Sequence, residues 1–399
     1  MHFVTRSIPP VEDVLNRDPD TVWMSPETSL WGWGAAARIH PGSGGDRLEV
    51  VRRRLGDLVA AADVDDPLGT DATGPVALVS STFATGAGGS VAVVPRVVVG
   101  RRGDDWWQTS LDGAPLPEPV GAPADRTDRA RYAGSSVPDV LWLEAVAEAV
   151  RRIRRGDLEK VVLSRDYAVW SRQPFEARVL LRYLHRRFPQ CHVFRIEGLV
   201  GASPELLVRR SGDRFQSLVL AGSTPSYSDP TRDTAAARAL LESDKDRWEH
   251  ELSVRSVRQA MAPFTAEADI ADQPEILRLD NVQHLATAVT ARVLDGHDAL
   301  TLAAALHPTA AVGGTPTAAA VSTIAELEGM DRGRYTGPVG WTDTRGDGEF
   351  AIALRCAEIS GARARLFAGA GIVADSLPES ELDETRVKLA AMMGALDAV

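Results

Sequence analysis

The sequence predicts an α+β fold, and three patterns support this class. Runs rich in Val, Ile, Trp and Thr, separated by Gly, Asp and Pro, dominate the first 110 residues and recur in the last quarter. Segments with apolar residues at three- and four-residue steps lie between these runs and at the C-terminal end. The strand-like runs are too irregularly connected for a simple series of βαβ units.

The N-terminal part is predicted to consist of strands and turns, with strands at 31–39, 75–83, 89–100 and 104–111. Residues 112–138 are rich in Pro, Ala, Gly and Asp, which indicates a loop at a junction between two parts of the chain. We therefore expect one domain over residues 1–399, with a variable β-rich part at 1–135 and a second part at 136–399.

An amphipathic helix is predicted from Asp139 to Arg155. Its apolar positions, among them Val146, Val150 and Ile153, recur at three- and four-residue steps. Asp139 is a plausible N-cap, and Gly156 a plausible helix stop. The elements expected after it are strands at 160–170, 191–203 and 215–223, a long helix at 234–262, an apolar stretch at 281–293, strands at 337–343, 349–360 and 363–373, and a closing helix at 380–396.

Composition narrows the class of protein. The chain has 399 residues, is 44% hydrophobic and carries a net charge of −11, which argues against nucleic acid or an anionic membrane as a partner. Two cysteines are too few for a disulfide framework. No apolar run reaches membrane-spanning length, and the first 25 residues lack the pattern of a secretory leader. We therefore expect a cytoplasmic protein.

Two acidic clusters are candidate metal ligands. Asp246, Glu249 and His250 have the spacing i, i+3, i+4, and Glu381, Glu384 and Lys388 have the spacing i, i+3, i+7, so each set shares one helix face. Carboxylates from two helices suit Mg²⁺, which keeps several waters and also binds substrate oxygens. Each cluster taken singly is more typical of a solvated face with i,i+4 pairs. No zinc motif is present.

Other candidate groups are ambiguous by themselves. Lys160 begins a strand, where it is either a snorkelling edge residue or, if desolvated, a general base. Glu205 follows a Ser-Pro turn and is either an exposed carboxylate or an acid with a raised pKa. His284 and His307 are each more typical of structural histidines. The glycines of 369–374 continue an extended run, and those of 311–316 resemble a turn, so neither favours a nucleotide site.

Ten short sequence blocks follow one another along the chain, and their order is more specific for a protein family than any single block. They are KVVLSR (160–165), GASPELLVRR (201–210), LAGST (220–224), SDKDRWEHEL (243–252), VQHLAT (282–287), LHPTAAVGGTP (306–316), YTGPVGW (335–341), GEFAIALRCA (348–357), LFAGAGIV (366–373) and ELDETRVKL (381–389). Together they resemble the chorismate-utilising enzymes, which include isochorismate, salicylate, anthranilate and aminodeoxychorismate synthases. The resemblance covers about 155–399 strongly and 1–150 only loosely.

The resemblance implies an anthranilate synthase component I-like fold, with large antiparallel sheets packed together, helices outside and an active-site cleft between the halves. It implies that 136–399 is the chorismate-binding catalytic region. It also implies roles for individual residues. They are Lys160 and Glu205 as catalytic base and acid; Glu249 and Glu384 as Mg²⁺ ligands supported by Asp246 and Glu381; and Gly222, Ser223, His284, Tyr335, Arg355, Gly369 and Lys388 as substrate-binding residues.

Within the family, Lys160 favours water as the nucleophile, because the ammonia-using members lack a lysine there. The implied reaction is that of an isochorismate synthase, an isomerase: water adds at C2 of chorismate and the C4 hydroxyl leaves, feeding menaquinone or siderophore biosynthesis. We expect no nucleic acid, membrane or glutamine amidotransferase partner, and a monomer. Salicylate synthase and a non-catalytic ligand-binding subunit are the alternatives. Pro225 and Ala310 differ from the residues that many family members carry at these two positions.

Overall fold

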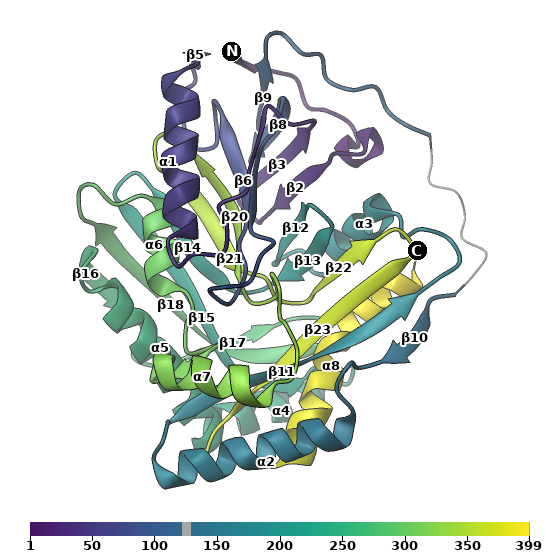
Figure 1. Ribbon diagram of the computed structural model, residues 1–399, viewed down its shortest axis with the longest axis vertical. Helices are drawn as coiled ribbons and strands as arrows, with labels where there is room; N and C mark the ends of the chain where they lie inside the picture. Colours follow the sequence, from purple (N-terminus) through teal and green to yellow (C-terminus); the bar gives the residue numbers. More distant parts are fainter. Residues whose placement is uncertain (122–128, 399) are drawn as a thin grey trace.

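Two large β-sheets form the centre of the protein, and helices cover their outer faces (Figure 1). The structure is a computed structural model that describes residues 1–121 and 129–398. Every strand pair in it is antiparallel except the pairing of β1 with β5. The predicted α+β class is therefore confirmed.

The first sheet has 13 strands, and its order mixes the two parts of the chain. From one edge to the other it runs β10 (Arg131–Gly134), β11 (Lys160–Trp170), β23 (Arg363–Ile372), β22 (Cys356–Ser360), β13 (Leu199–Ser203), β12 (His192–Ile196), β2 (Thr21–Met24), β3 (Thr28–Trp33), β8 (Val97–Arg102), β9 (Asp105–Leu111), β1 (His2–Ser7) and β5 (Asp63–Asp65), with β19 (Gly314–Thr315) beside β11.

The second sheet has ten strands and is also built from both parts. Its order is β16 (Thr265–Ile270), β18 (Val282–Val293), β15 (Arg214–Pro225), β14 (Leu206–Ser211), β21 (Gly348–Ile352), β20 (Pro338–Asp343), β6 (Val76–Ser80), β7 (Val91–Val94) and β4 (Ala37–Ile39), with β17 (Glu275–Arg278) beside β18. The pairings β2–β12 and β6–β20 join residues 1–135 to residues 136–399. The division at residue 135 stays a prediction.

The helices are α1 (Arg47–Ala60), α2 (Asp139–Arg155), α3 (Ala177–Arg187), α4 (Pro230–Glu242), α5 (Asp244–Met261), α6 (Ala299–Leu306), α7 (Thr317–Leu327) and α8 (Pro378–Asp397), with a short 3₁₀ turn, η1 (Val14–Arg17). Helices α1, α5 and α6 pack on the second sheet, α3 and α8 on the first, and α2 and α7 on β11 (Figure 1).

A buried apolar layer lies between the two sheets. It contains Trp23, Phe194, Trp341 and Phe367, each at most 2% exposed, from four strands of the two sheets. Strands that are apolar on both faces fit this position, because one face meets the other sheet and the opposite face meets helices. The arrangement of packed sheets with helices outside is therefore confirmed.

Several predicted elements match the structure closely. The helix over 139–155 and the strand over 160–170 have the bounds of α2 and β11, and Gly156 ends α2 with a φ of 85°. Asp139 was expected as the N-cap, which is wrong: Pro138 holds that position and Asp139 is the first helical residue. Its carboxylate instead pairs with Arg165 and Arg386.

Other predicted elements are divided or interrupted in the structure. The helix over 234–262 is two helices, because Ser243 has an extended backbone and its hydroxyl caps α5 at Asp246. The strand over 191–203 is a hairpin that turns at Glu197 and Gly198, both with positive φ. Residues 349–360 likewise divide into β21 and β22. Helix α1 interrupts the N-terminal β-rich part, and β10 lies inside the predicted loop, of which 122–128 fall outside the described residues.

Candidate active site

One pocket between the two sheets gathers most of the predicted site residues. It is lined by ten of them, from residue 205 to residue 388: Glu205, Gly222, Ser223, Glu249, His284, Tyr335, Arg355, Gly369, Glu384 and Lys388. Strands β15 and β18 of the second sheet form one wall, and β23 of the first sheet forms another. Helices α5 and α8 contribute the acidic residues.

Lys160 is completely buried at the start of β11 and does not itself line the pocket, but its amine reaches Glu249, which does. Its Nζ lies 3.1 Å from Glu249 Oε1 and 3.1 Å from the Ser253 hydroxyl. The adjacent Gly371 makes this approach possible, because a Cβ there would lie 2.1 Å from Glu249 Oε1. Lys160 is therefore not a snorkelling edge residue.

Glu205 is buried, with only 4% of its surface exposed, so it is not the exposed strand-end carboxylate of the alternative interpretation. Burial raises its pKa to about 8, although Lys160, Arg355 and Lys388 act in the opposite direction. The Leu220 N–H donates a hydrogen bond to the carboxyl group. At neutral pH the group therefore carries a proton and is available as an acid.

The two acidic clusters face each other from α5 and α8. Burial raises the pKa of Asp246, and the charges of Glu249 and Glu384 raise it further. Burial and the charge of Glu384 likewise raise the pKa of Glu381. Such mutual repulsion between carboxylates is relieved by a bound cation.

Lysines partly neutralise this acidic group. Lys388 Nζ lies 2.5 Å from Glu384 Oε1 and donates to the Gly369 carbonyl at 3.0 Å. Burial alone would raise the pKa of Glu384, but Lys388 beside it holds that pKa below its usual value. The Ser223 hydroxyl also donates to Glu384 Oε1, at 3.0 Å.

Lys245 belongs to the site but was missed in the sequence. Its Nζ lies 2.6 Å from Glu381 Oε1. The chain has 44 basic residues, of which Lys160, Lys245 and Lys388 are the only lysines, and each pairs with a different glutamate of the two helices. In a chain that otherwise uses arginine, the rarity of lysine is the signal that could have identified Lys245, because lysine supplies a compact charge that arginine does not.

Arg355 and His284 form a pair in the pocket wall. Arg355 Nη2 lies 3.2 Å from His284 Nε2, and since arginine only donates, Nε2 is the acceptor. Burial and the charges of Arg355 and Lys388 keep the pKa of His284 well below its usual value, so its ring is neutral. The Gly222 carbonyl holds its other nitrogen. The buried Nε of Arg355 has no hydrogen-bond partner among the described residues, so one donor is left for a ligand.

Tyr335 forms part of the pocket floor. It is 2% exposed and stacks on Phe367, with ring centroids 5.0 Å apart and planes at 9°. Burial raises the pKa of its hydroxyl above the usual value, so the phenol stays protonated and can donate a hydrogen bond.

The carboxylates fit Mg²⁺ in their chemistry, since they offer hard oxygen ligands with unrelieved repulsion. In residues 1–121 and 129–398, no group of three or more His, Cys, Asp or Glu side chains is arranged to hold a metal by itself.

Several other candidates are structural. His250 contacts the Ala221 carbonyl and the Thr287 hydroxyl, and burial lowers its pKa to about 4. His307 contacts the Phe83 carbonyl at 3.0 Å. The glycines of 369–374 lie within β23, so that stretch does not open a helix as a dinucleotide motif requires. Of the glycines of 311–316, Gly314 begins β19.

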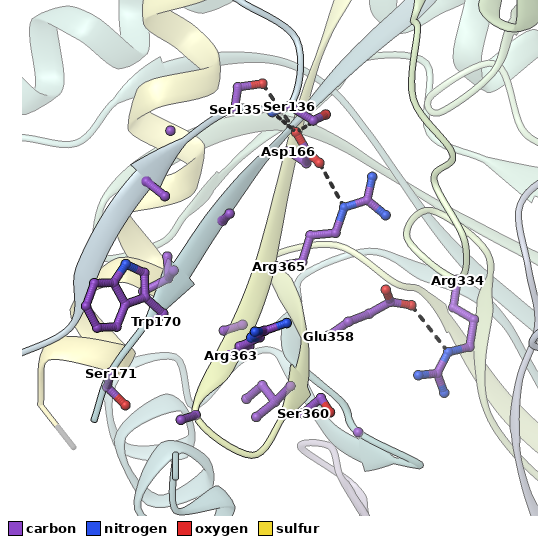
Figure 2. Close-up of a pocket in the computed structure, with 18 of the residues that line it drawn as sticks. Ser135, Ser136, Asp166, Trp170, Ser171, Arg334, Glu358, Ser360, Arg363 and Arg365 are labelled. Carbon is purple, nitrogen blue, oxygen red and sulfur yellow. Dashed lines mark hydrogen bonds and ion pairs between the residues drawn. The ribbon is translucent and has the colours of Figure 1, made fainter. Parts of the chain in front are cut away.

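A larger groove, of about 1110 Å³, contains none of the predicted site residues (Figure 2). Most of its charged side chains form hydrogen bonds or ion pairs with other residues of the groove. Asp166 accepts hydrogen bonds from Ser135, Ser136 and Arg365, and Glu358 pairs with Arg334 at 3.7 Å. Size alone therefore does not make this groove the candidate site, because the raised pKa of Glu205 and the unpartnered Nε of Arg355 belong to the smaller pocket.

Comparison with known proteins defines the class. The sequence model of the family described as chorismate binding enzyme matches residues 119–397, and the chain belongs to this family. A Pseudomonas aeruginosa protein named salicylate biosynthesis isochorismate synthase is 35% identical over 418 residues, with 96% of this chain and 85% of that protein covered. Isochorismate synthase DhbC of Bacillus subtilis is 41% identical over 267 residues, covering 64% and 67%.

The fold is also shared with solved structures. The crystal structure of DhbC from Bacillus anthracis superposes with a TM-score of 0.83 at 30% identity, covering 97% of this chain and 99% of that one. The anthranilate synthase component I-like fold expected from the motifs is confirmed. No helix among the described residues is long and apolar enough to cross a membrane.

Proposed function

We propose that this chain is an isochorismate synthase that converts chorismate to isochorismate in the presence of Mg²⁺. A water oxygen bonds to C2 of the ring, the double bonds shift, and the C4 hydroxyl leaves as water. The observation that carries the proposal is the buried amine of Lys160, which contacts Glu249 in the pocket wall. The names of relatives that are 35 to 41% identical support it.

Lys160 is the general base. Its Nζ faces two acceptors, the Glu249 carboxylate and the Ser253 oxygen. The Ser253 hydroxyl proton is already donated to the Glu249 carbonyl at 3.1 Å, so Ser253 can only accept from the lysine. These two contacts orient the amine, which in its unprotonated form takes the proton of the attacking water.

Glu205 is the general acid. Its carboxyl group is protonated at neutral pH because burial raises its pKa to about 8. It donates this proton to the C4 hydroxyl as the C–O bond breaks, so that water leaves instead of hydroxide. In one turnover Lys160 gains a proton and Glu205 loses one. After the product leaves, proton exchange with solvent returns both side chains to their starting protonation.

The substrate carboxylates are held by groups with spare hydrogen-bond capacity. The unpartnered Nε of Arg355 and the protonated hydroxyl of Tyr335 donate to one carboxylate, and Lys388 adds a positive charge. The backbone at Gly222, Ser223 and Gly369 allows close approach to the ligand. Neutral His284 accepts from Arg355 and keeps the guanidinium in place.

Glu249 and Glu384 would hold Mg²⁺, with Asp246 and Glu381 one helical turn away in support. When bound, the ion neutralises the ring carboxylate and so favours build-up of negative charge in the ring. The protein residues orient the substrate ring and keep bulk water, as distinct from the attacking water molecule, away from it.

Chorismate incubated with the purified chain and Mg²⁺, followed by chromatography of the products, tests the proposal. Isochorismate as the sole product is expected. Salicylate together with pyruvate would favour the salicylate synthase alternative. An ammonium-dependent amine product, or no turnover, would overturn the proposal. We further propose that the protein acts as a cytoplasmic monomer and supplies menaquinone or siderophore synthesis; light scattering and gene-deletion phenotypes test these points.

A further inference from the structure

A buried charged cluster lies behind the pocket, where the two sheets meet. Glu349 on β21 is 1% exposed, and its Oε1 lies 3.0 Å from His192 Nε2 and 3.0 Å from Arg209 Nη2. Burial alone would raise the pKa of Glu349, but His192 and Arg209 lower it to about 2. The carboxylate is therefore ionised. It links β12 of the first sheet to β14 and β21 of the second.

The ring of His192 contacts two hydrogen-bond acceptors. Nε2 faces the ionised carboxylate, and Nδ1 lies 3.2 Å from the Ser203 carbonyl oxygen. Both partners can only accept, so in each contact the ring nitrogen is the donor when it carries a proton. Trp23 packs against the ring, with centroids 5.4 Å apart. Glu27, which pairs with Arg209, supplies the second negative charge of the cluster.

Ser203 connects this cluster to the pocket. It ends β13, and after Pro204 comes Glu205, the group assigned here as the general acid. The Glu205 N–H donates to the Ser203 hydroxyl at 3.3 Å, and the Glu205 carbonyl accepts from Ile352 N–H at 3.2 Å. The position of Ser203 therefore sets where the Glu205 side chain starts.

We propose that His192 is a positioning residue for catalysis: it ties the Ser203 carbonyl to the buried Glu349 carboxylate and so holds Glu205 in place. This inference rests on the proposed function of Glu205. His192 does not touch the pocket, and none of the sequence motifs that indicate the site includes it.

Two conservative substitutions separate the two contacts of His192. In His192→Asn the amide nitrogen replaces Nδ1 and retains the bond to Ser203, whereas in His192→Gln it replaces Nε2 and retains the bond to Glu349. If His192 positions Glu205 through Ser203, Asn preserves most of kcat and Gln lowers it, by up to about 100-fold for a displacement near 1 Å. KM stays within a few-fold in both variants, because the substrate-binding residues are untouched.

The melting temperatures of the two variants are expected to follow the opposite order from their kcat values. Asn removes a partner of a buried charge and lowers the melting temperature more than Gln does. The proposal thus predicts opposite orders: Gln is the more stable variant and Asn the more active one. Activities that follow the order of stability, or equal kcat values for both variants, would overturn it, because the role would then be structural only.

A double-mutant comparison separates this inference from the proposed function. In a Glu205→Gln background, His192→Gln is expected to cause no further loss of kcat. An additional full loss there would show that His192 does not act through Glu205. If the wild-type chain fails to form isochorismate, the proposed function fails, and the same variants measured on the product that is formed still report on His192.

Discussion

Lys160 Nζ lies 3.1 Å from Glu249 Oε1, so the proposed base and a proposed Mg²⁺ ligand share one buried ion pair. A cation bound to Glu249 competes with the lysine for the same carboxylate. The proposed Mg²⁺ binding and the proposed base would therefore be linked, so removal of Lys160 should change Mg²⁺ binding and removal of Glu249 should change turnover.

Lys160→Ala should reduce kcat by at least about 1000-fold, because the variant lacks the amine that takes the proton of the attacking water. Circular dichroism should show an intact fold, with some loss of stability since Glu249 loses its partner. Steady-state kinetics with chorismate provide the measurement. Wild-type turnover in this variant would exclude Lys160 as the base.

Glu249→Gln and Glu384→Gln should each weaken Mg²⁺ binding by more than about tenfold, because each removes one charged ligand. Glu251→Gln is a matched control, since Glu251 lies on the same helix as Glu249 but is exposed. Calorimetric titration with Mg²⁺ provides the measurement. Titrations unchanged from wild type would remove both residues as ligands.

The activity should fall as the pH rises above about 8. The raised pKa of Glu205 means that its acid form is complete below that value and is lost above it. The rate should then drop by up to about tenfold for each further pH unit. A profile of kcat between pH 6 and 10 checks this, and a constant rate up to pH 10 would contradict the assignment of Glu205 as the acid.

Lys245→Met should tighten Mg²⁺ binding by about 3- to 10-fold at low salt, because it removes a positive charge beside the carboxylates. Without metal, the variant should melt at a lower temperature, since buried Glu381 loses its partner. Arg247→Met, at an exposed position of the same helix, is the control. Titration and melting with EDTA provide both readouts, and weaker Mg²⁺ binding would contradict the prediction.

Gly371→Ala should abolish activity and weaken Mg²⁺ binding, because the added methyl group would collide with Glu249 Oε1 at 2.1 Å. Gly56→Ala makes the same chemical change in α1, where nothing lies within 4 Å of the new Cβ, and should leave activity unchanged. Assay of the two variants side by side isolates the effect of the contact. Equal activities would mean that Glu249 moves aside without consequence.

Local patterns were sufficient for much of the fold. The apolar steps of 139–155 and the strand-like run of 160–170 predicted α2 and β11 to the residue, because such patterns depend on neighbours within one element. The break at Ser243 was missed, since a capping serine is distinguished from any other helical serine only by its backbone conformation.

The sequence by itself determined the family, through the order of its ten blocks and the residues in them. The family in turn indicated which side chains are candidates for the active site. Only the tertiary structure decided their states. Glu205 became an acid with a pKa near 8, Lys160 became an amine held by Glu249 and Ser253, and His192 became a bridge to Ser203. The reason is physical: burial and charge pairing depend on residues far apart in the chain, 89 positions for Lys160 and Glu249 and 93 for Lys160 and Ser253, and no local pattern records them.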